Sequence, residues 1–130
     1  MQSLRSQREE SHDTLCEELL RERAAVLARA GRAVEDALAE LTKLEHQIKI
    51  IQEQLKTLMI QDHDADNIQE QQLLIAEINS IIDQFNTVRK TAQLKYYYLI
   101  VTREAMGLRR HNMIQEIYII PARKKKMQVF

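Results

Sequence analysis

Apolar side chains recur every seven residues along residues 27–58. Ten positions share this repeat and all ten are apolar: Leu27, Ala30, Val34, Ala37, Leu41, Leu44, Ile48, Ile51, Leu55 and Leu58. A repeat of seven with two apolar positions keeps one stripe of a helix facing a partner helix. Because a single rod cannot bury its own stripe, the pattern predicts a long helix packed against a second one.

The first helix has candidate start signals shortly before this repeat. Ser11 or Asp13 can cap it, and no proline interrupts the chain from there to Gln61. We therefore expect the helix to run from about residue 13 to Gln61. Residues 1–12 are polar, and we predict that they form a flexible N-terminal segment.

Six polar residues at 62–67 interrupt the apolar pattern and predict a turn. Asp66 and Gln69 have the spacing of a capping box, which marks the start of a second helix. The alternating acids here resemble the opening of a calcium loop, but Asn67 and Leu73 occupy the places of its glycine and its bidentate glutamate. We therefore interpret the segment as a solvated turn, which makes the flanking helices antiparallel neighbours.

The second helix is predicted over residues 68–106. Its apolar stripe is broad and comprises Leu74, Ile75, Ile78, Ile81, Ile82, Phe85, Val88, Ala92, Tyr96 and Leu99. A stripe of this width exceeds what a two-helix seam needs. It predicts a third layer, supplied either by the C-terminal segment or by another subunit.

A turn centred on residues 64–65 sets the register of the predicted hairpin, in which residue i faces roughly residue 129 − i. Phe85 then lies opposite Leu44. The bulky tyrosine triplet at 96–98 lies opposite the small-residue patch around Gly31. Since facing layers must fill space, this match of large with small side chains supports the register.

The C-terminal segment carries signals of a different kind. Gly107 is well placed to cap the second helix, and residues 108–116 can form one short helix. The apolar strip at 117–121 is β-branched and ends in the only proline, so we expect it to be extended. It can lie along its own hairpin or dock to a partner. A basic tail follows, and it ends in the apolar Val129 and Phe130.

Composition supports a fold class without sheets. Two glycines and one proline in 130 residues cannot supply the turns of a sheet protein. We predict an all-α fold: a long antiparallel helical hairpin, or coiled coil, over residues 13–106, with a short C-terminal helix and an extended basic tail over residues 107–130.

Charge is neutral overall but sorted along the chain. Residues 1–60 hold nine basic and eleven acidic groups, residues 61–88 hold six acidic and no basic ones, and residues 89–130 hold ten basic and two acidic ones. The acidic tip complements the basic end. Together with the broad stripe of the second helix, this predicts a homo-oligomer, with a dimer of antiparallel hairpins favoured.

Catalysis and cofactor chemistry find little support. No two histidines have helical metal-ligand spacing, no serine lies in a glycine elbow, and the chain has no glycine-rich phosphate loop. We expect a non-enzyme without cofactor or metal. The lone Cys16, the polar N-terminus and the absence of a long apolar run predict a soluble cytoplasmic protein with no membrane span.

The favoured function is a non-enzymatic coiled-coil interaction or scaffold module that binds protein partners through helix–helix association and a C-terminal docking segment. The candidate protein contacts are Leu74, Ile78, Ile81, Phe85, Tyr96, Tyr97, Ile117, Tyr118, Ile119 and Ile120. One alternative is nucleic-acid binding by the basic end. Its candidate phosphate contacts are Arg103, Arg109, Arg110, Arg123, Lys124, Lys125 and Lys126. The other alternative is a chaperone-like clamp for a protein client.

Overall fold

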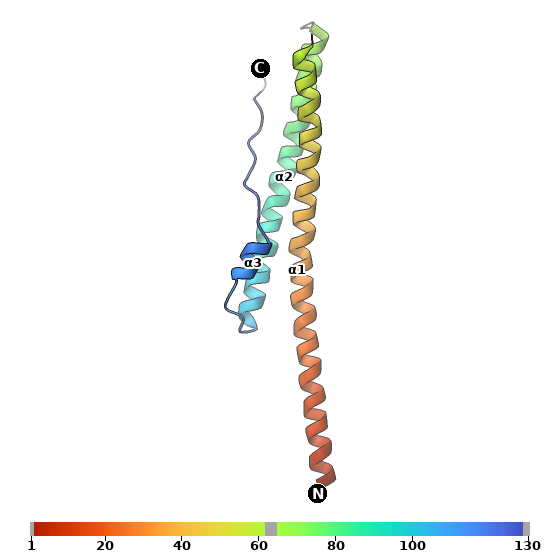
Figure 1. The fold of residues 1–130 in the computed structure, drawn as a ribbon, viewed down its shortest axis with the longest axis vertical. Helices are drawn as coiled ribbons and strands as arrows, with labels where there is room; N and C mark the ends of the chain where they lie inside the picture. The colour runs from red at the N-terminus through yellow and green to blue at the C-terminus, as the bar shows by residue number, and fades with distance from the viewer. Residues whose placement is uncertain (1, 62–64, 129–130) are drawn as a thin grey trace.

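Two long helices form an antiparallel hairpin in the computed structural model, which describes residues 2–61 and 65–128, with side chains over 3–61 and 67–128. Helix α1 spans Gln2–Ile60, α2 spans Ala65–Ala105, and the short α3 spans Asn112–Ile117. After α3 the chain is extended and runs back beside α2 toward the turn (Figure 1). The predicted all-α hairpin with a short C-terminal helix is confirmed, and the described residues contain no strand.

The heptad positions form the core between α1 and α2. One cluster lies nearer the turn and comprises Ile48, Ile51, Leu55, Ile75, Ile78 and Ile82. The other lies nearer the open end and comprises Ala37, Leu41, Leu44, Phe85 and Ala92. Seven of the ten apolar heptad positions predicted in α1 are buried, because the seven-residue repeat turns these side chains toward α2.

The observed pairing follows the predicted register. Leu44 and Phe85 belong to the same core cluster, and so do Ala37 and Ala92. Each pair satisfies the rule that residue i faces residue 129 − i. The two helices therefore pair along the hairpin in the register predicted from the sequence.

Helix α1 is longer at its start than the sequence signals indicated. It begins at Gln2 and continues through Ser11 and Asp13, so the predicted cap at these residues is wrong. At about 1.5 Å per residue, the 59 residues of α1 span about 88 Å and the 41 residues of α2 about 61 Å. The N-terminal part of α1 therefore projects beyond the end of α2 (Figure 1).

In the polar segment at 62–67, the side chain that the structure describes is that of Asn67, which is buried. Asn67 is 8% exposed, and its Nδ2 donates to the carbonyl oxygen of Leu58 at 3.1 Å. Its Oδ1 accepts from Gln71 Nε2 at 3.1 Å. Asn67 thus satisfies a carbonyl near the end of α1, where the last turn of a helix lacks intrahelical donors. The proposed turn residues 62–64 and the capping side chain of Asp66 lie outside the described residues.

Gly107 ends α2 as predicted. Its φ of +84° lies in the left-handed region that favours glycine. The Leu108 N–H donates to the Arg103 carbonyl at 2.9 Å and the Gly107 N–H to the Glu104 carbonyl at 3.0 Å, which is a Schellman cap. The short helix expected from residue 108 begins only at Asn112, because the cap first turns the chain away from α2.

Candidate functional site

The extended segment after α3 lies on α2 with a period of three residues. Tyr118, Pro121, Lys124 and Met127 are half-buried, and most residues between them are exposed. Three residues per turn is the period of a left-handed polyproline-type chain, whereas a β-strand alternates with a period of two. One edge of this segment therefore faces the hairpin, with contacts to α2 and also to Glu35 and Glu45 of α1. We refer to residues 118–128 as the tail.

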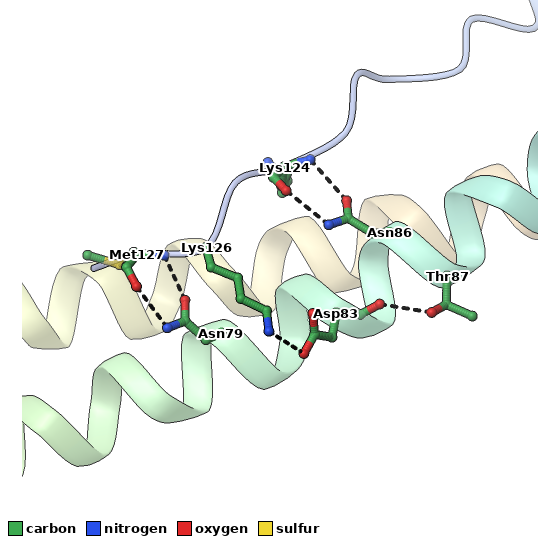
Figure 2. A network of polar contacts seen from close by, with 7 residues as sticks. All are labelled: Asn79, Asp83, Asn86, Thr87, Lys124, Lys126 and Met127. Atoms are coloured by element: carbon green, nitrogen blue, oxygen red, sulfur yellow. Dashed lines mark hydrogen bonds and ion pairs between the residues drawn. The ribbon is translucent and has the colours of Figure 1, made fainter. Parts of the chain in front are cut away.

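Side chains of α2 hold the tail by its backbone (Figure 2). The Asn86 side chain donates from Nδ2 to the Lys124 carbonyl at 2.9 Å, and its Oδ1 accepts from the Lys124 N–H at 3.0 Å. Asn79 makes the same pair of bonds with Met127, at 2.9 and 2.7 Å. A side-chain amide can satisfy both polar groups of one residue in this way, whatever that residue's side chain is.

The spacing of these contacts matches helix and tail. Asn79 and Asn86 are seven residues apart, which is about 10.5 Å along a helix. Lys124 and Met127 are three residues apart, which is about 9 to 10 Å along an extended chain. Further along, Arg89 lies only three residues after Asn86, and its Nε donates to the Pro121 carbonyl at 2.7 Å. The tail thus runs antiparallel to α2, with matched spacing between the contacts of Asn79 and Asn86.

The tail supplies the third layer predicted from the breadth of the α2 stripe. Ile120 packs against the core cluster that contains Phe85, and Met127 packs against the cluster that contains Ile78. The two core clusters are therefore covered by apolar side chains of the same chain. Of the two possibilities left open by the sequence, the C-terminal segment provides this layer, and it does so in an extended conformation.

The basic tail also meets acidic side chains of its own hairpin. Lys124 Nζ lies 3.4 Å from Glu45 Oε1 and 4.9 Å from the centre of the Phe85 ring. Lys126 Nζ lies 3.1 Å from Asp83 Oδ2 (Figure 2). Part of the charge complementarity that favoured a dimer of hairpins is therefore satisfied within one chain.

At the open end, Tyr118 links the start of the tail to α1. Its hydroxyl donates to Glu35 Oε1 at 2.7 Å. This hydrogen bond raises the pKa of Tyr118, and desolvation and the charge of Glu35 raise that pKa further. A Cβ placed on Gly31 would lie 3.5 Å from the same hydroxyl. Gly31 therefore faces Tyr118.

Tyr97 and Tyr98 do not fill the small-residue patch, so the packing prediction is wrong for these two members of the triplet, whereas Tyr96 is half-buried. Tyr97 and Tyr98 are 61% and 51% exposed, and their ring planes are inclined by 52°. They share an exposed helix face with Leu94 and Val101, at the i, i+3, i+4, i+7 spacing of one stripe. This surface faces away from the hairpin core because Leu99 and Ala92 take the core-facing positions.

The candidate protein contacts divide by burial. Ile78 and Phe85 are fully buried inside the hairpin and have no surface to offer a partner. Leu74, Ile81, Tyr96, Tyr118 and Ile120 are half-buried. Tyr97, Ile117 and Ile119 are exposed, at 61%, 61% and 72%. The sequence pattern alone cannot separate core-facing from solvent-facing members of a broad apolar stripe.

The candidate phosphate contacts divide in a similar way. Arg103 donates from Nε to His111 Nδ1 at 3.3 Å and from Nη2 to the Arg110 carbonyl at 2.9 Å, so it braces the loop after α2. Lys124 and Lys126 pair with the carboxylates described above. The remaining four are exposed: Arg109, Arg110, Arg123 and Lys125.

The most extensive exposed surface is one that the sequence interpretation missed. Every residue from 3 to 26 of α1 is exposed. The large apolar side chains among them are Leu4, Leu15, Leu19, Leu20 and Val26. The register rule could have found this surface, because a second helix that ends near residue 105 reaches only to about residue 24 of the first.

Comparison with protein-family models, curated proteins and solved structures gave no significant match. Within residues 2–61 and 65–128, neither α1 nor α2 contains a stretch apolar enough to cross a membrane. In the same residues, no three His, Cys, Asp or Glu side chains gather as a metal-binding group.

Proposed function

We propose that this protein is a non-enzymatic coiled-coil interaction module, a scaffold that associates with other helices through the projecting part of α1 (residues 3–26). The observation that carries the proposal is the exposure of this entire stretch, including Leu15 at 64% and Leu19 at 49%. Most helical stability in proteins comes from packing an apolar face, so an isolated amphipathic helix gains stability by binding another.

The hairpin has a separate role in this proposal. Its seam and the tail bury the heptad positions, so the hairpin acts as a rigid base that presents the projecting helix. The exposed stripe of Leu94, Tyr97, Tyr98 and Val101 offers a second, smaller contact surface at the open end. Tyrosine and aliphatic side chains together are typical of the centre of protein interfaces.

The test compares two positions of equal exposure. Leu15 and Leu20 are 64% and 65% exposed, but they lie on different sides of α1. We use each full chain as bait in an extract of cells that express the protein. The chain with both Leu15→Asp and Leu19→Asp should no longer bind its helical partner, whereas the Leu20→Asp chain should still bind it. Equal capture by the wild type, the Leu15→Asp/Leu19→Asp chain and the Leu20→Asp chain would contradict the proposal.

Nucleic-acid binding by the basic end is the second candidate, supported by the exposure of Arg109, Arg110, Arg123 and Lys125. Four phosphate contacts give a slope of about −3 to −4 in log K against log salt. Nucleic-acid binding in a gel shift at low salt, with a binding constant that falls with this slope as salt is raised, supports the candidate. Absence of a shift at low salt excludes it.

A further inference from the structure

Four of the five large exposed apolar side chains of the projecting helix form one stripe. Leu4, Leu15, Leu19 and Val26 fall within about 60° around α1, at 100° per residue. Leu20 lies about 130° from the centre of this stripe, by the same geometry. All four stripe residues are exposed, and no element of the described chain covers them. The stripe is about 24 residues long, which is about 36 Å.

Size and polarity along the stripe are complementary to the same stripe reversed about Leu15. Eleven residues to either side of Leu15 stand Leu4 and Val26, which are both apolar. Four residues to either side stand Ser11, which is small, and Leu19, which is large. Reversing the helix about Leu15 therefore sets apolar against apolar and large against small, as a packed interface requires.

Charge follows the same symmetry. Seven residues to either side of Leu15 stand Arg8 and Glu22, both within the stripe. A parallel pair in register would bring each of these residues against its own copy, so that like charges meet. An antiparallel pair brings Arg8 of each copy against Glu22 of the other, twice by symmetry. The charge pattern thus selects the antiparallel arrangement.

The surface between Leu4 and Leu15 is hollowed in the way this pairing needs. A shallow groove of about 400 Å³ is lined by Leu4, Gln7, Arg8, Ser11, His12 and Leu15. Four of these residues, Arg8, Ser11, His12 and Leu15, have the i, i+3, i+4, i+7 spacing of a coiled-coil hole. The reversed partner places Leu19 over Ser11, at the centre of this hole.

We propose that residues 3–26 of two copies of this chain pair as antiparallel helices, with Leu15 on the two-fold axis. The interface is isologous, so both copies use the same surface and the assembly closes as a dimer. The two hairpins then point away from each other. This inference rests on the proposed function, because it names the helix that the projecting part of α1 meets.

Cross-linking between single cysteines tests the orientation. Leu4→Cys and Val26→Cys are each placed in a full chain in which the exposed Cys16 is replaced by serine. The two chains carry tags of different mass, are mixed and are oxidised mildly. We expect the product that joins positions 4 and 26 to exceed the 4–4 and 26–26 products. Excess of the latter two overturns the antiparallel arrangement.

A charge exchange provides a test that does not depend on cysteine chemistry. Arg8→Glu alone should raise the dimer dissociation constant about tenfold, since it sets two like-charge contacts in place of two ion pairs. Adding Glu22→Arg restores the ion pairs only when the helices are antiparallel. Dimerisation that stays weak in the Arg8→Glu/Glu22→Arg chain contradicts the proposal.

Sedimentation separates the failure of this inference from the failure of the proposed function. A full chain that remains monomeric up to about 100 µM overturns pairing between copies. If that monomer still captures a partner that Leu15→Asp with Leu19→Asp abolishes, the interaction module stands with a different helix as its partner. If it captures none, both proposals fail.

Discussion

The side chain of Asn86 holds the backbone of Lys124 at both of its polar groups, with a donated bond of 2.9 Å and an accepted bond of 3.0 Å. Lys124 follows Asn86 by 38 residues in the sequence. The contact therefore depends on the docking of the tail on α2, because a local turn could not join residues so far apart in the sequence. Its strength can be measured separately from the stability of the hairpin.

Asn86→Ala should loosen the tail and leave the hairpin folded. The change removes two hydrogen bonds whose backbone partners can turn to water, at a cost of about 1 to 2 kcal/mol. Hydrogen exchange of the tail should accelerate about 5- to 30-fold, because exchange follows the free energy of local opening. The neighbouring exposed Thr87→Ala serves as the control. Unchanged protection of the tail in Asn86→Ala would contradict the structure.

Lys124 and Lys125 should respond differently to truncation, although they are adjacent and identical. Lys124→Ala removes a partly exposed ion pair with Glu45 and the contact with the Phe85 ring, together worth about 1 kcal/mol for tail docking. Lys125→Ala removes an exposed side chain and should change nothing measurable. Hydrogen-exchange rates of the tail amides, measured in the Lys124→Ala and Lys125→Ala chains, compare the two effects. Equal effects would mean that the contacts of Lys124 with Glu45 and the Phe85 ring contribute nothing to tail docking.

Tyr118→Phe should alter how stability depends on pH. The hydrogen bond to Glu35 raises the pKa of Tyr118 in the folded chain, so the folded state holds this proton more tightly than the unfolded state does. The contribution of Tyr118 is fully present below its unfolded pKa of about 10, and it declines as pH rises through the folded pKa. The stability difference between the wild type and Tyr118→Phe should therefore shrink above pH ~10. Chemical denaturation across pH 8 to about 11 measures it; a constant difference would be the contrary result.

Gly31→Ala should stabilise α1. The added Cβ meets the Tyr118 hydroxyl at 3.5 Å, an ordinary contact, and alanine gains about 1 kcal/mol of helix propensity over glycine. Gly31→Leu carries side-chain atoms further into the same space and should displace Tyr118 from Glu35. Its melting temperature should fall below that of Gly31→Ala. A higher value for leucine would show that this space is open.

Ile78→Asp should unfold the hairpin. Ile78 is fully buried in the core cluster nearer the turn, and an unpaired carboxylate there costs several kcal/mol. Circular dichroism should show loss of the cooperative thermal transition. Ser80→Asp, two residues away and exposed, is the matched control and should melt like the wild type. Cooperative melting of both chains at the same temperature would refute the assigned core.

Sequence reasoning succeeded where one physical effect dominates. Burial of apolar stripes set the seam and its register, and the left-handed backbone required after α2 identified Gly107. These signals are local or periodic, so they can be read without knowing which distant segments meet. The length of α1 was underestimated because polar residues before Leu15 were interpreted as loss of structure.

The sequence left open whether the tail lies along its own hairpin or docks to a partner, because the polar contacts that decide this join residues distant in sequence. Asn79 and Asn86 look like ordinary solvent-facing positions of a helix. The only trace in the sequence is a coincidence of spacings, seven residues on the helix and three on the tail, and neither spacing means anything alone. The sequence predicts an extended strip from residue 117, but Ile117 ends α3 and the extended chain begins at Tyr118. The location of the tail depends on side-chain amides that many helices carry without using them.

The matched spacing of Asn79 with Met127 and of Asn86 with Lys124 couples the two backbone contacts of the tail. If the tail shifted by one residue along α2, Pro121, Lys124 and Met127 would all lose their hydrogen bonds to α2. These bonds therefore form in one register of the tail. Release would uncover the core at two places at once, beneath Ile120 and beneath Met127. We therefore expect the tail to bind and leave both core clusters of the hairpin as one unit.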